Sequence, residues 1–230
     1  MSTDATVVLA HGAWADGSSW SKVISGLRAF GVNAVAAPLP LTSLAADVAA
    51  LNRTLERVSG PVVLAAHAYA GAVIASARAE SVEALVYVAA LAPDEGETVA
   101  DVFYRAAPHA DAPALAPDDD ALIWLPEEAF GAAFAQNASA EEKAVLHAVQ
   151  RPISPECITV AVGRPLWRDR PSWFLIAQDD RMIAAETQRF MAGRMGATVR
   201  EHAVDHAPLV TAPSLVIDLI LEARALGRGR

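Results

Sequence analysis

The amino-acid sequence predicts an α/β fold, with a mostly parallel sheet, helices on both faces of the sheet and a helical cap insertion. Short apolar segments rich in β-branched residues alternate with amphipathic segments of helical length, which is typical of a parallel sheet covered on both faces. The alternation stops at about residue 92 and resumes after about residue 170. We therefore expect a single domain over residues 1–230 whose cap, residues 92–170, lies over the carboxyl ends of the strands, where open α/β sheets bind ligands.

The elements before the cap follow from hydrophobic spacing and from turn residues. The expected strands are residues 5–10, 33–37, 61–66 and 82–90, and the expected helices are residues 18–30, 41–60 and 71–79. Ser18 or Ser19 is a suitable N-cap for the first helix, and Gly60 is expected to end the second one.

The cap and the last part of the chain are predicted in the same way. The cap is rich in Pro and Asp and contains two helical pieces, residues 126–135 and 140–150. After it we expect strands at residues 172–177 and 197–203 and helices at residues 187–195 and 214–226.

Composition excludes several classes of protein. With 53% apolar and 20% charged residues among 230, the chain has a globular, core-forming composition. The net charge of −9 without a basic stripe argues against binding to nucleic acid. No apolar run approaches the length of a membrane span. The N-terminal residues do not have the pattern of a secretory signal, and a single cysteine suits a reducing compartment, so a cytoplasmic location is expected.

The segment LAAHAYAGAVI, residues 64–74, raises the main question about function. A strand that enters a turn of small residues and leaves as a helix is the pattern of a nucleophile elbow, G-x-S-x-G, which holds a serine at the tip of the turn. Here both motif glycines and the serine position are alanine, with Ala68 at the position of the nucleophile. An acyl-enzyme on the usual route is therefore excluded.

Three other strand ends carry candidate chemistry. HGAWADGSSW follows the first strand, and the backbone N–H of Ala13 there, with that of Tyr69 in the elbow, could stabilise an oxyanion. AQDDRMI and VDHAPLV follow the last two strands and supply an acid and a histidine, in the chain order of a catalytic triad. Such an acid orients the imidazole and stabilises its protonated form.

Together with ALVYVAALAPDEGE, RFMAGRMGATV and DHAPLVTAP, these segments resemble the α/β-hydrolase superfamily over essentially the whole chain. The chain is most similar to a compact bacterial esterase-like branch, related to hydroxynitrile lyases and plant methyl esterases. The resemblance implies an α/β-hydrolase fold, with Asp180 rather than Asp179 as the triad acid and His206 as the triad histidine. It also places Ala13 and Tyr69 at the oxyanion-hole positions and Ala68 at the nucleophile.

The remaining candidate residues have structural as well as functional interpretations. His11 is expected to fix its loop by a local hydrogen bond, and His67 to pack inside the turn. Cys157 is a candidate pocket residue, although a lone cysteine in apolar sequence is usually an inert small hydrophobe. The candidate aromatic pocket residues, for which an ordinary core role is an equal alternative, are Trp14, Tyr104, Trp124 and Trp167. No metal site and no cofactor are expected.

Three functions remain open from the sequence. The first is general acid/base catalysis on a small carbonyl or ester compound, using the His206–Asp180 dyad and the oxyanion hole. The second is a serine esterase in which Ala68 replaces the nucleophile by engineering, and the third is a non-catalytic module that binds a small ligand. A small-molecule substrate is the expected partner, and the oligomeric state, a homodimer included, stays open. If the elbow geometry is kept, Ala68 should have a positive φ angle.

Overall fold

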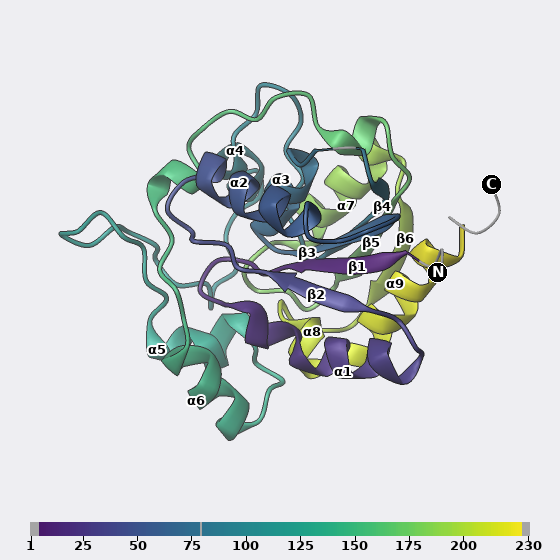
Figure 1. Ribbon diagram of the computed structural model, residues 1–230. Helices are drawn as coiled ribbons and strands as arrows, with labels where there is room; N and C mark the ends of the chain where they lie inside the picture. The colour runs from purple at the N-terminus through teal and green to yellow at the C-terminus, as the bar shows by residue number, and fades with distance from the viewer. Residues whose placement is uncertain (1–4, 79, 227–230) are drawn as a thin grey trace.

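The computed structural model describes residues 5–78 and 80–226. Its centre is a parallel sheet of six strands in the order β2-β1-β3-β4-β5-β6 (Figure 1). The strands are β1 (Thr6–Ala10), β2 (Ala34–Ala37), β3 (Val62–His67), β4 (Val82–Val88), β5 (Ser172–Ala177) and β6 (Thr198–His202). The predicted α/β class and the parallel sheet are confirmed.

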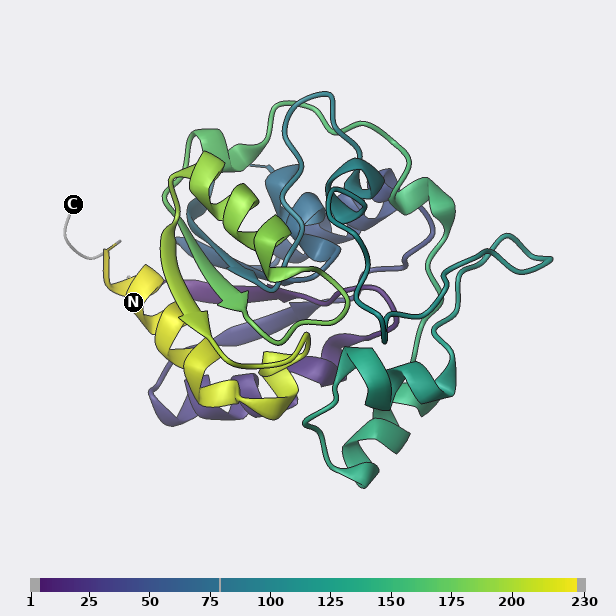
Figure 2. The same ribbon diagram turned by 180° about the vertical axis from the view of Figure 1, so that it is seen from behind.

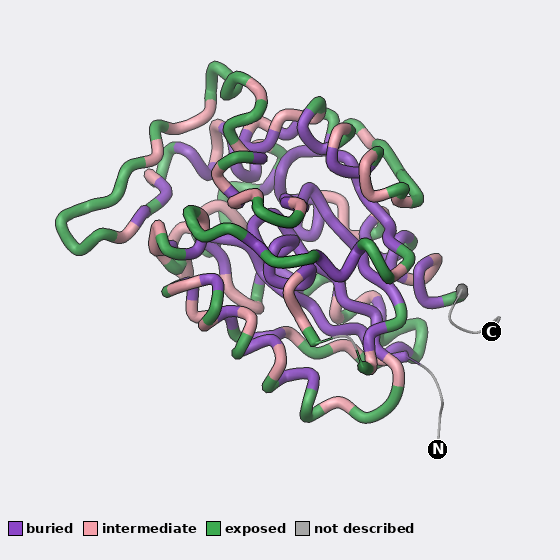
Figure 3. The backbone as a smooth tube through the Cα atoms, turned by 90° about the horizontal axis from the view of Figure 1, so that it is seen from above, coloured by how far each residue is buried: buried purple, intermediate pink, exposed green. Residues whose placement is uncertain are grey.

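Helices cover both faces of the sheet, as Figures 1 and 2 show. One face carries α1 (Ser21–Ala29), α8 (Pro208–Thr211) and α9 (Pro213–Leu226), and the other carries α2 (Leu44–Leu55), α3 (Ala70–Ala75) and α7 (Ala185–Met195). The strands β3 and β5 are buried along their whole length, and the interior of the tube in Figure 3 is mostly purple, the colour of buried residues. This double cover explains why their sequences are almost continuously apolar.

Residues 89–171, between β4 and β5, form what we call the β4–β5 segment. It begins at the carboxyl end of β4, and its last residues return to the amino end of β5, because the two strands are parallel (Figure 1). The segment contains α4 (Val99–Phe103), α5 (Glu127–Ala129), a π-helix η2 (Phe130–Phe134), α6 (Ala140–Ala148) and the 3₁₀ turns η3 (Pro155–Cys157) and η4 (Leu166–Arg168). No helix in the described part of the chain is long and apolar enough to cross a membrane.

The structure corrects the predicted ends of several helices. The first helix begins with a 3₁₀ turn, η1 (Gly17–Trp20), and its N-cap is Asp16 rather than Ser18 or Ser19, because the Asp16 carboxylate accepts the N–H of Ser18 at 2.8 Å. The helix α2 ends at Leu55, well before Gly60, which has a φ of 85° in the following turn. The helix α3 ends at Ala75, and residue 79, its predicted end, lies outside the described residues.

Candidate active site

The turn between β3 and α3 keeps the geometry of a nucleophile elbow. Ala68, at its tip, has a φ of 49°, which confirms the expected left-handed conformation. A non-glycine residue there costs on the order of 1–3 kcal/mol and persists only where the surroundings impose it. Here the N–H of Ala68 donates to the carbonyl of Val88, and the carbonyl of Ala68 accepts the N–H of Leu91 at 2.9 Å. The chain that follows β4 therefore holds the turn in place.

The close approach in the elbow occurs one residue after the motif. A Cβ atom at Gly71 would lie 2.2 Å from the carbonyl oxygen of Leu91, so only glycine fits at this position. Ala66 and Ala70, which stand where the motif has glycine, are fully buried without needing such space. Gly12 in turn packs beneath the tip, because a Cβ there would lie 3.0 Å from the Cβ of Ala68. The alanine-rich elbow is thus compatible with an intact turn.

Asp180 and His206 meet at the carboxyl end of the sheet. The imidazole Nδ1 of His206 lies 2.8 Å from Oδ2 of Asp180, and both side chains are buried. A proton on Nδ1 that is donated to the carboxylate leaves Nε2 with a free lone pair. Nε2 makes no hydrogen bond within the described residues. The dyad therefore presents a proton acceptor to whatever occupies the site.

The loop after β5 fixes the carboxylate of Asp180. Its Oδ1 accepts the N–H groups of Met182 and Ile183, each at 2.8 Å, and its Oδ2 also accepts the side-chain amide of Gln188 at 2.8 Å. These donors favour the ionised form of the carboxyl group and set its orientation. Asp179, in contrast, is exposed, so the assignment of the hydrogen-bonded acid to Asp180 agrees with the structure.

The backbone N–H groups of Ala13 and Tyr69 belong to residues that line the same cavity, at the positions expected for an oxyanion hole. Both residues are buried and line one cavity with Ala68 and His206. Among residues 5–78 and 80–226, no hydrogen bond occupies either N–H group. The loop after β1 is held by Trp14, whose N–H donates to the carbonyl of Arg151 at 3.1 Å. A pair of fixed, unoccupied donors can stabilise negative charge on an oxygen atom.

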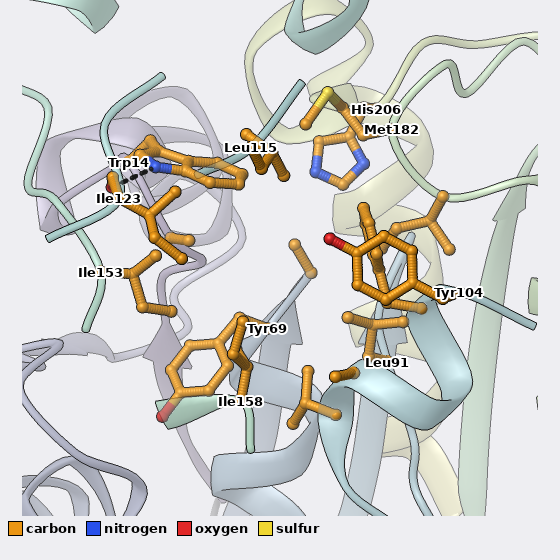
Figure 4. Close-up of a pocket in the computed structure, with 16 residues that line it drawn as sticks. Trp14, Tyr69, Leu91, Tyr104, Leu115, Ile123, Ile153, Ile158, Met182 and His206 are labelled. Carbon is orange, nitrogen blue, oxygen red and sulfur yellow. Dashed lines mark hydrogen bonds between the residues drawn. The ribbon is translucent and has the colours of Figure 1, made fainter. Parts of the chain in front are cut away.

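The cavity between the sheet and the β4–β5 segment is mostly apolar (Figure 4). It encloses about 60 Å³, room for on the order of four or five water-sized groups. Trp14 and Tyr104 line it as predicted, and the indole of Trp14 is fixed by a hydrogen bond to the carbonyl of Ile123 at 2.9 Å. The imidazole of His206 faces the hydroxyl end of Tyr104 across the upper part of the cavity in Figure 4.

Other predicted pocket residues lie elsewhere. Trp124 is 47% exposed and donates its indole N–H to the carboxylate of Asp118 at 3.0 Å. Trp167 is buried against Pro93, and neither tryptophan lines the cavity. Cys157 is buried behind the wall of the cavity, although its neighbour Ile158 faces the interior. Their placement depends on the path of the β4–β5 segment, which has little periodicity.

His11 and His67 have the structural roles that the sequence suggested. The ring of His11 donates to the carbonyl of Gly12 at 3.0 Å, and Nε2 of His67 donates to the carbonyl of His206 at 2.7 Å. Burial lowers the pKa of His11, and it lowers the pKa of His67 well below its usual range, helped by the nearby His206. Both rings are therefore neutral near pH 7, and His67 supports the loop that carries His206.

A buried polar cluster that the sequence analysis did not identify supports the elbow from behind. The hydroxyl of Tyr69 donates to Oδ2 of Asp47 at 2.7 Å, and Oδ1 of Asp47 accepts the N–H of Leu41. The thiol of Cys157 lies 3.6 Å from the same carboxylate. Burial raises the pKa of Asp47 and raises that of Cys157 to about 12, so the thiol is not a nucleophile at neutral pH.

The described residues contain no group of three His, Cys, Asp or Glu side chains placed to hold a metal ion. The polar groups around the cavity are the His206 imidazole, its carboxylate partner, the hydroxyl of Tyr104 and two backbone donors, in an apolar enclosure.

The fold and the comparison with known families together identify the class of protein. The sequence profile of the alpha/beta hydrolase family matches residues 7–219, and the chain belongs to that family. No curated protein sequence matches the chain.

Solved structures share the fold over nearly the whole chain. A pyrethroid hydrolase, PytH, is 20% identical with a TM-score of 0.82, covering 99% of this chain and 100% of its own. Polyneuridine aldehyde esterase is 17% identical with a TM-score of 0.79, covering 95% of this chain and 98% of its own. A mutant of methylketone synthase I from tomato is 15% identical with a TM-score of 0.79, covering 95% of this chain and 97% of its own. At these identities, the likeness shows the α/β-hydrolase fold.

Proposed function

We propose that this protein catalyses proton transfer at a carbon atom next to a carbonyl group, without a covalent intermediate and without a cofactor. One observation carries the proposal: the dyad of His206 and Asp180 faces a cavity whose nucleophile position is Ala68. An intact acid/base pair beside two backbone donors, with no serine hydroxyl at the nucleophile position, suits the formation and protonation of an enolate.

In the proposed step, Nε2 of His206 takes a proton from the α-carbon, and the electron pair of that C–H bond moves to the carbonyl oxygen. The N–H groups of Ala13 and Tyr69 stabilise the negative oxygen. Asp180 stabilises the imidazolium through Nδ1. Return of the proton to the enolate restores both the ring and the carbonyl compound. Isomerisation by proton transfer and cyclisation by attack of the enolate both begin with this step.

The substrate is inferred to be a small neutral or weakly acidic carbonyl compound. The lining of the cavity is mostly apolar, and the imidazole of His206 is the nitrogen base in it. The names of two proteins with this fold, an aldehyde esterase and a methylketone synthase, also refer to carbonyl compounds.

Exchange of α-protons for deuterium tests the proposal directly. The protein is incubated with 2-butanone in D₂O at pH 7, and loss of the α-proton signals is followed by NMR. We expect exchange faster than with buffer alone, and a decrease of about 10²–10⁴-fold in His206→Ala, the usual contribution of a general base. Asp179→Asn, which changes the exposed neighbour of the dyad acid, serves as the matched control. Exchange at the same rate in His206→Ala and the unmodified protein would refute the proposal.

A second candidate function is ester hydrolysis by a protein in which Ala68 replaces a catalytic serine. The positive φ of 49° at Ala68 favours it, because the strained conformation would aim a serine hydroxyl into the cavity. Ala68→Ser should then hydrolyse aryl acetates roughly 10- to 100-fold faster than the unmodified protein, since a grafted hydroxyl is imperfectly aligned. The gain should disappear in the double variant Ala68→Ser, His206→Ala. A gain that survives in the double variant contradicts this candidate.

A role limited to ligand binding is the third candidate. The contact between His206 and Asp180 argues against it, because an oriented imidazole is not needed to enclose an apolar ligand. A protein that binds 2-butanone but neither exchanges its α-protons nor gains esterase activity in Ala68→Ser would favour this role.

A further inference from the structure

A second cavity adjoins the catalytic one. It encloses about 150 Å³ beneath residues 103–115, the part of the β4–β5 segment that follows α4. Phe103, Tyr104, Leu115 and Met182 line both cavities, so the two share a wall made of flexible apolar and aromatic side chains. We call the first the inner chamber and the second the outer chamber.

The shared wall can open without moving the sheet. Tyr104 is 56% exposed, and Phe103 and Leu115 are only partly buried. In Figure 4, Leu115 and Tyr104 lie at the edge of the inner chamber on either side of His206. Rotation of exposed side chains takes place in picoseconds to nanoseconds, so these residues can give way to a bound molecule.

The outer chamber has the lining of an apolar binding site. Alanine and proline make up most of it, and its titratable side chains are Tyr104 and His109. Nδ1 of His109 accepts the N–H of Asp111 at 3.1 Å, which occupies that ring nitrogen. Asp111 is paired with Arg181 at 2.8 Å, and Arg181 also donates to the carbonyl of Ala132, which fixes this rim of the chamber. The chamber therefore offers apolar contact rather than charge.

The sizes of the two chambers set the shape of the molecule that fills them. The inner chamber holds on the order of four or five water-sized groups, enough for a carbonyl group and its immediate neighbours. The outer chamber holds on the order of ten such groups. A substrate confined to the inner chamber would leave the outer chamber unused.

We infer that the substrate is an extended carbonyl compound, with its reacting group beside His206 and an aliphatic chain or aromatic ring in the outer chamber. The inference rests on the proposed function, since it places the carbonyl in the same cavity. Phe103, Tyr104, Leu115 and Met182 then determine how long a substituent can pass, and burial of that substituent supplies affinity that the small inner chamber cannot.

A series of 2-alkanones from four to twelve carbons tests this inference by calorimetric binding. Affinity should increase about two- to fourfold per added methylene and level off when the outer chamber is full, since each buried methylene contributes a similar amount. In Leu115→Trp the indole should block the shared wall. The gain in affinity for long chains should then fall by about 10- to 100-fold.

Two further variants keep the test decisive. Val160→Trp adds the same indole at a half-exposed position outside both chambers and should retain the full dependence on chain length. Ala112→Val narrows the outer chamber alone and replaces Leu115→Trp if that variant does not fold. Equal loss in Leu115→Trp and Val160→Trp would overturn the inference, as would an affinity that does not change with chain length in the unmodified protein.

Failure of the inference and failure of the proposed function give different results. Chain-length-dependent binding without α-proton exchange for any ketone supports two chambers and refutes the proposed catalysis. Exchange of 2-butanone protons without any dependence of binding on chain length supports the catalysis and refutes the outer chamber as a substrate site.

Discussion

The two sides of the candidate site differ in the groups that they present. On the histidine side, the loops after β5 and β6 present side chains together with their support, since His206, Asp180 and Gln188 form one buried hydrogen-bonded group. On the elbow side, the turn after β3 presents only backbone groups, with Ala68 in a left-handed conformation and no hydroxyl. Side-chain chemistry and backbone geometry are thus separable within one site.

The difference shows where the elbow geometry comes from. At the tip, the N–H of Ala68 is bonded to Val88 and the carbonyl of Ala68 to Leu91, and Gly71 allows the close approach. None of these contacts involves the side chain at position 68. The conformation is imposed by the packing of β3, α3 and the chain after β4, so it persists whatever that side chain is.

The largest expected effect comes from a substitution on the histidine side of the site, Asp180→Asn. In Asp180→Asn, the amide oxygen should stay with the N–H groups of Met182 and Ile183, which places the NH₂ group against Nδ1 of His206. Two donors then face each other, so the ring proton moves to Nε2 and the base is lost. We expect α-proton exchange to slow by about 10²–10³-fold at pH 7, measured by NMR.

Asp179→Asn is the control for this prediction. It makes the same chemical change one residue earlier, at an exposed position, and should leave the exchange rate within about twofold. Equal rates in the two variants would mean that the carboxylate does not set the state of the imidazole.

The next largest effect comes from a substitution that disturbs the packing of the elbow, Gly71→Ala. A methyl group at Gly71 would meet the carbonyl oxygen of Leu91 at 2.2 Å, so Gly71→Ala must displace backbone. We expect a loss of about 2–4 kcal/mol in the free energy of unfolding, measured by urea denaturation. Gly193→Ala is the matched control, because that glycine lies inside α7 with open space around it and should gain up to about 1 kcal/mol. Equal stabilities of the two variants would contradict the argument.

The sequence predicted the parts of this site that lie at strand ends. Strands such as β3 and β5 are short, apolar and bounded by turn residues, so their carboxyl ends, and with them Ala68 and Asp180, could be placed from local pattern. The sheet then brings these ends to one edge, which needs no knowledge of side-chain packing.

The parts that depend on long-range packing could not be predicted. Trp124 and Cys157 were predicted to line the pocket. Because of the path of the β4–β5 segment, Trp124 is exposed to solvent and Cys157 is buried outside the cavity. Asp47 was overlooked, although a signal existed: it lies between Leu44 and Leu51 at helical spacing, on the apolar face of α2. A carboxylate on such a face must find donors inside the protein, and it finds Tyr69.

Low pH should decrease the free energy of unfolding, because two histidines beneath the elbow are buried in the folded protein. Burial keeps the pKa of His67 well below the value of about 6.5 expected in the unfolded chain, and it lowers that of His11 in the same direction. Below pH 6.5 the unfolded chain therefore binds protons that the folded protein does not. The contribution of these histidines to the free energy of unfolding is fully present above pH 6.5 and is lost as the pH falls. The raised pKa of Asp47 acts in the opposite direction.

We expect the free energy of unfolding to fall by about 1–2 kcal/mol between pH 7 and pH 5.5, since each such histidine contributes at most about 1.4 kcal/mol per pH unit. Urea denaturation at several pH values measures this slope. His67→Gln keeps a donor for the carbonyl of His206 and removes one titrating group, so its slope should be shallower. An identical slope in this variant would exclude His67 as a source of the acid sensitivity.

The smallest expected effect measures the strain in the elbow itself. Ala68→Gly removes the strain of the left-handed conformation, which costs roughly 1–2 kcal/mol for alanine. It also increases the backbone entropy of the unfolded chain, which costs roughly 0.5–1 kcal/mol. The net result should be a gain of up to about 1 kcal/mol in the free energy of unfolding. Ala70→Gly, two residues later in the helical conformation of α3, has no strain to relieve and should lose about 1 kcal/mol. If both variants lose stability equally, Ala68 is not strained in solution, and a serine grafted there would not be aimed at His206.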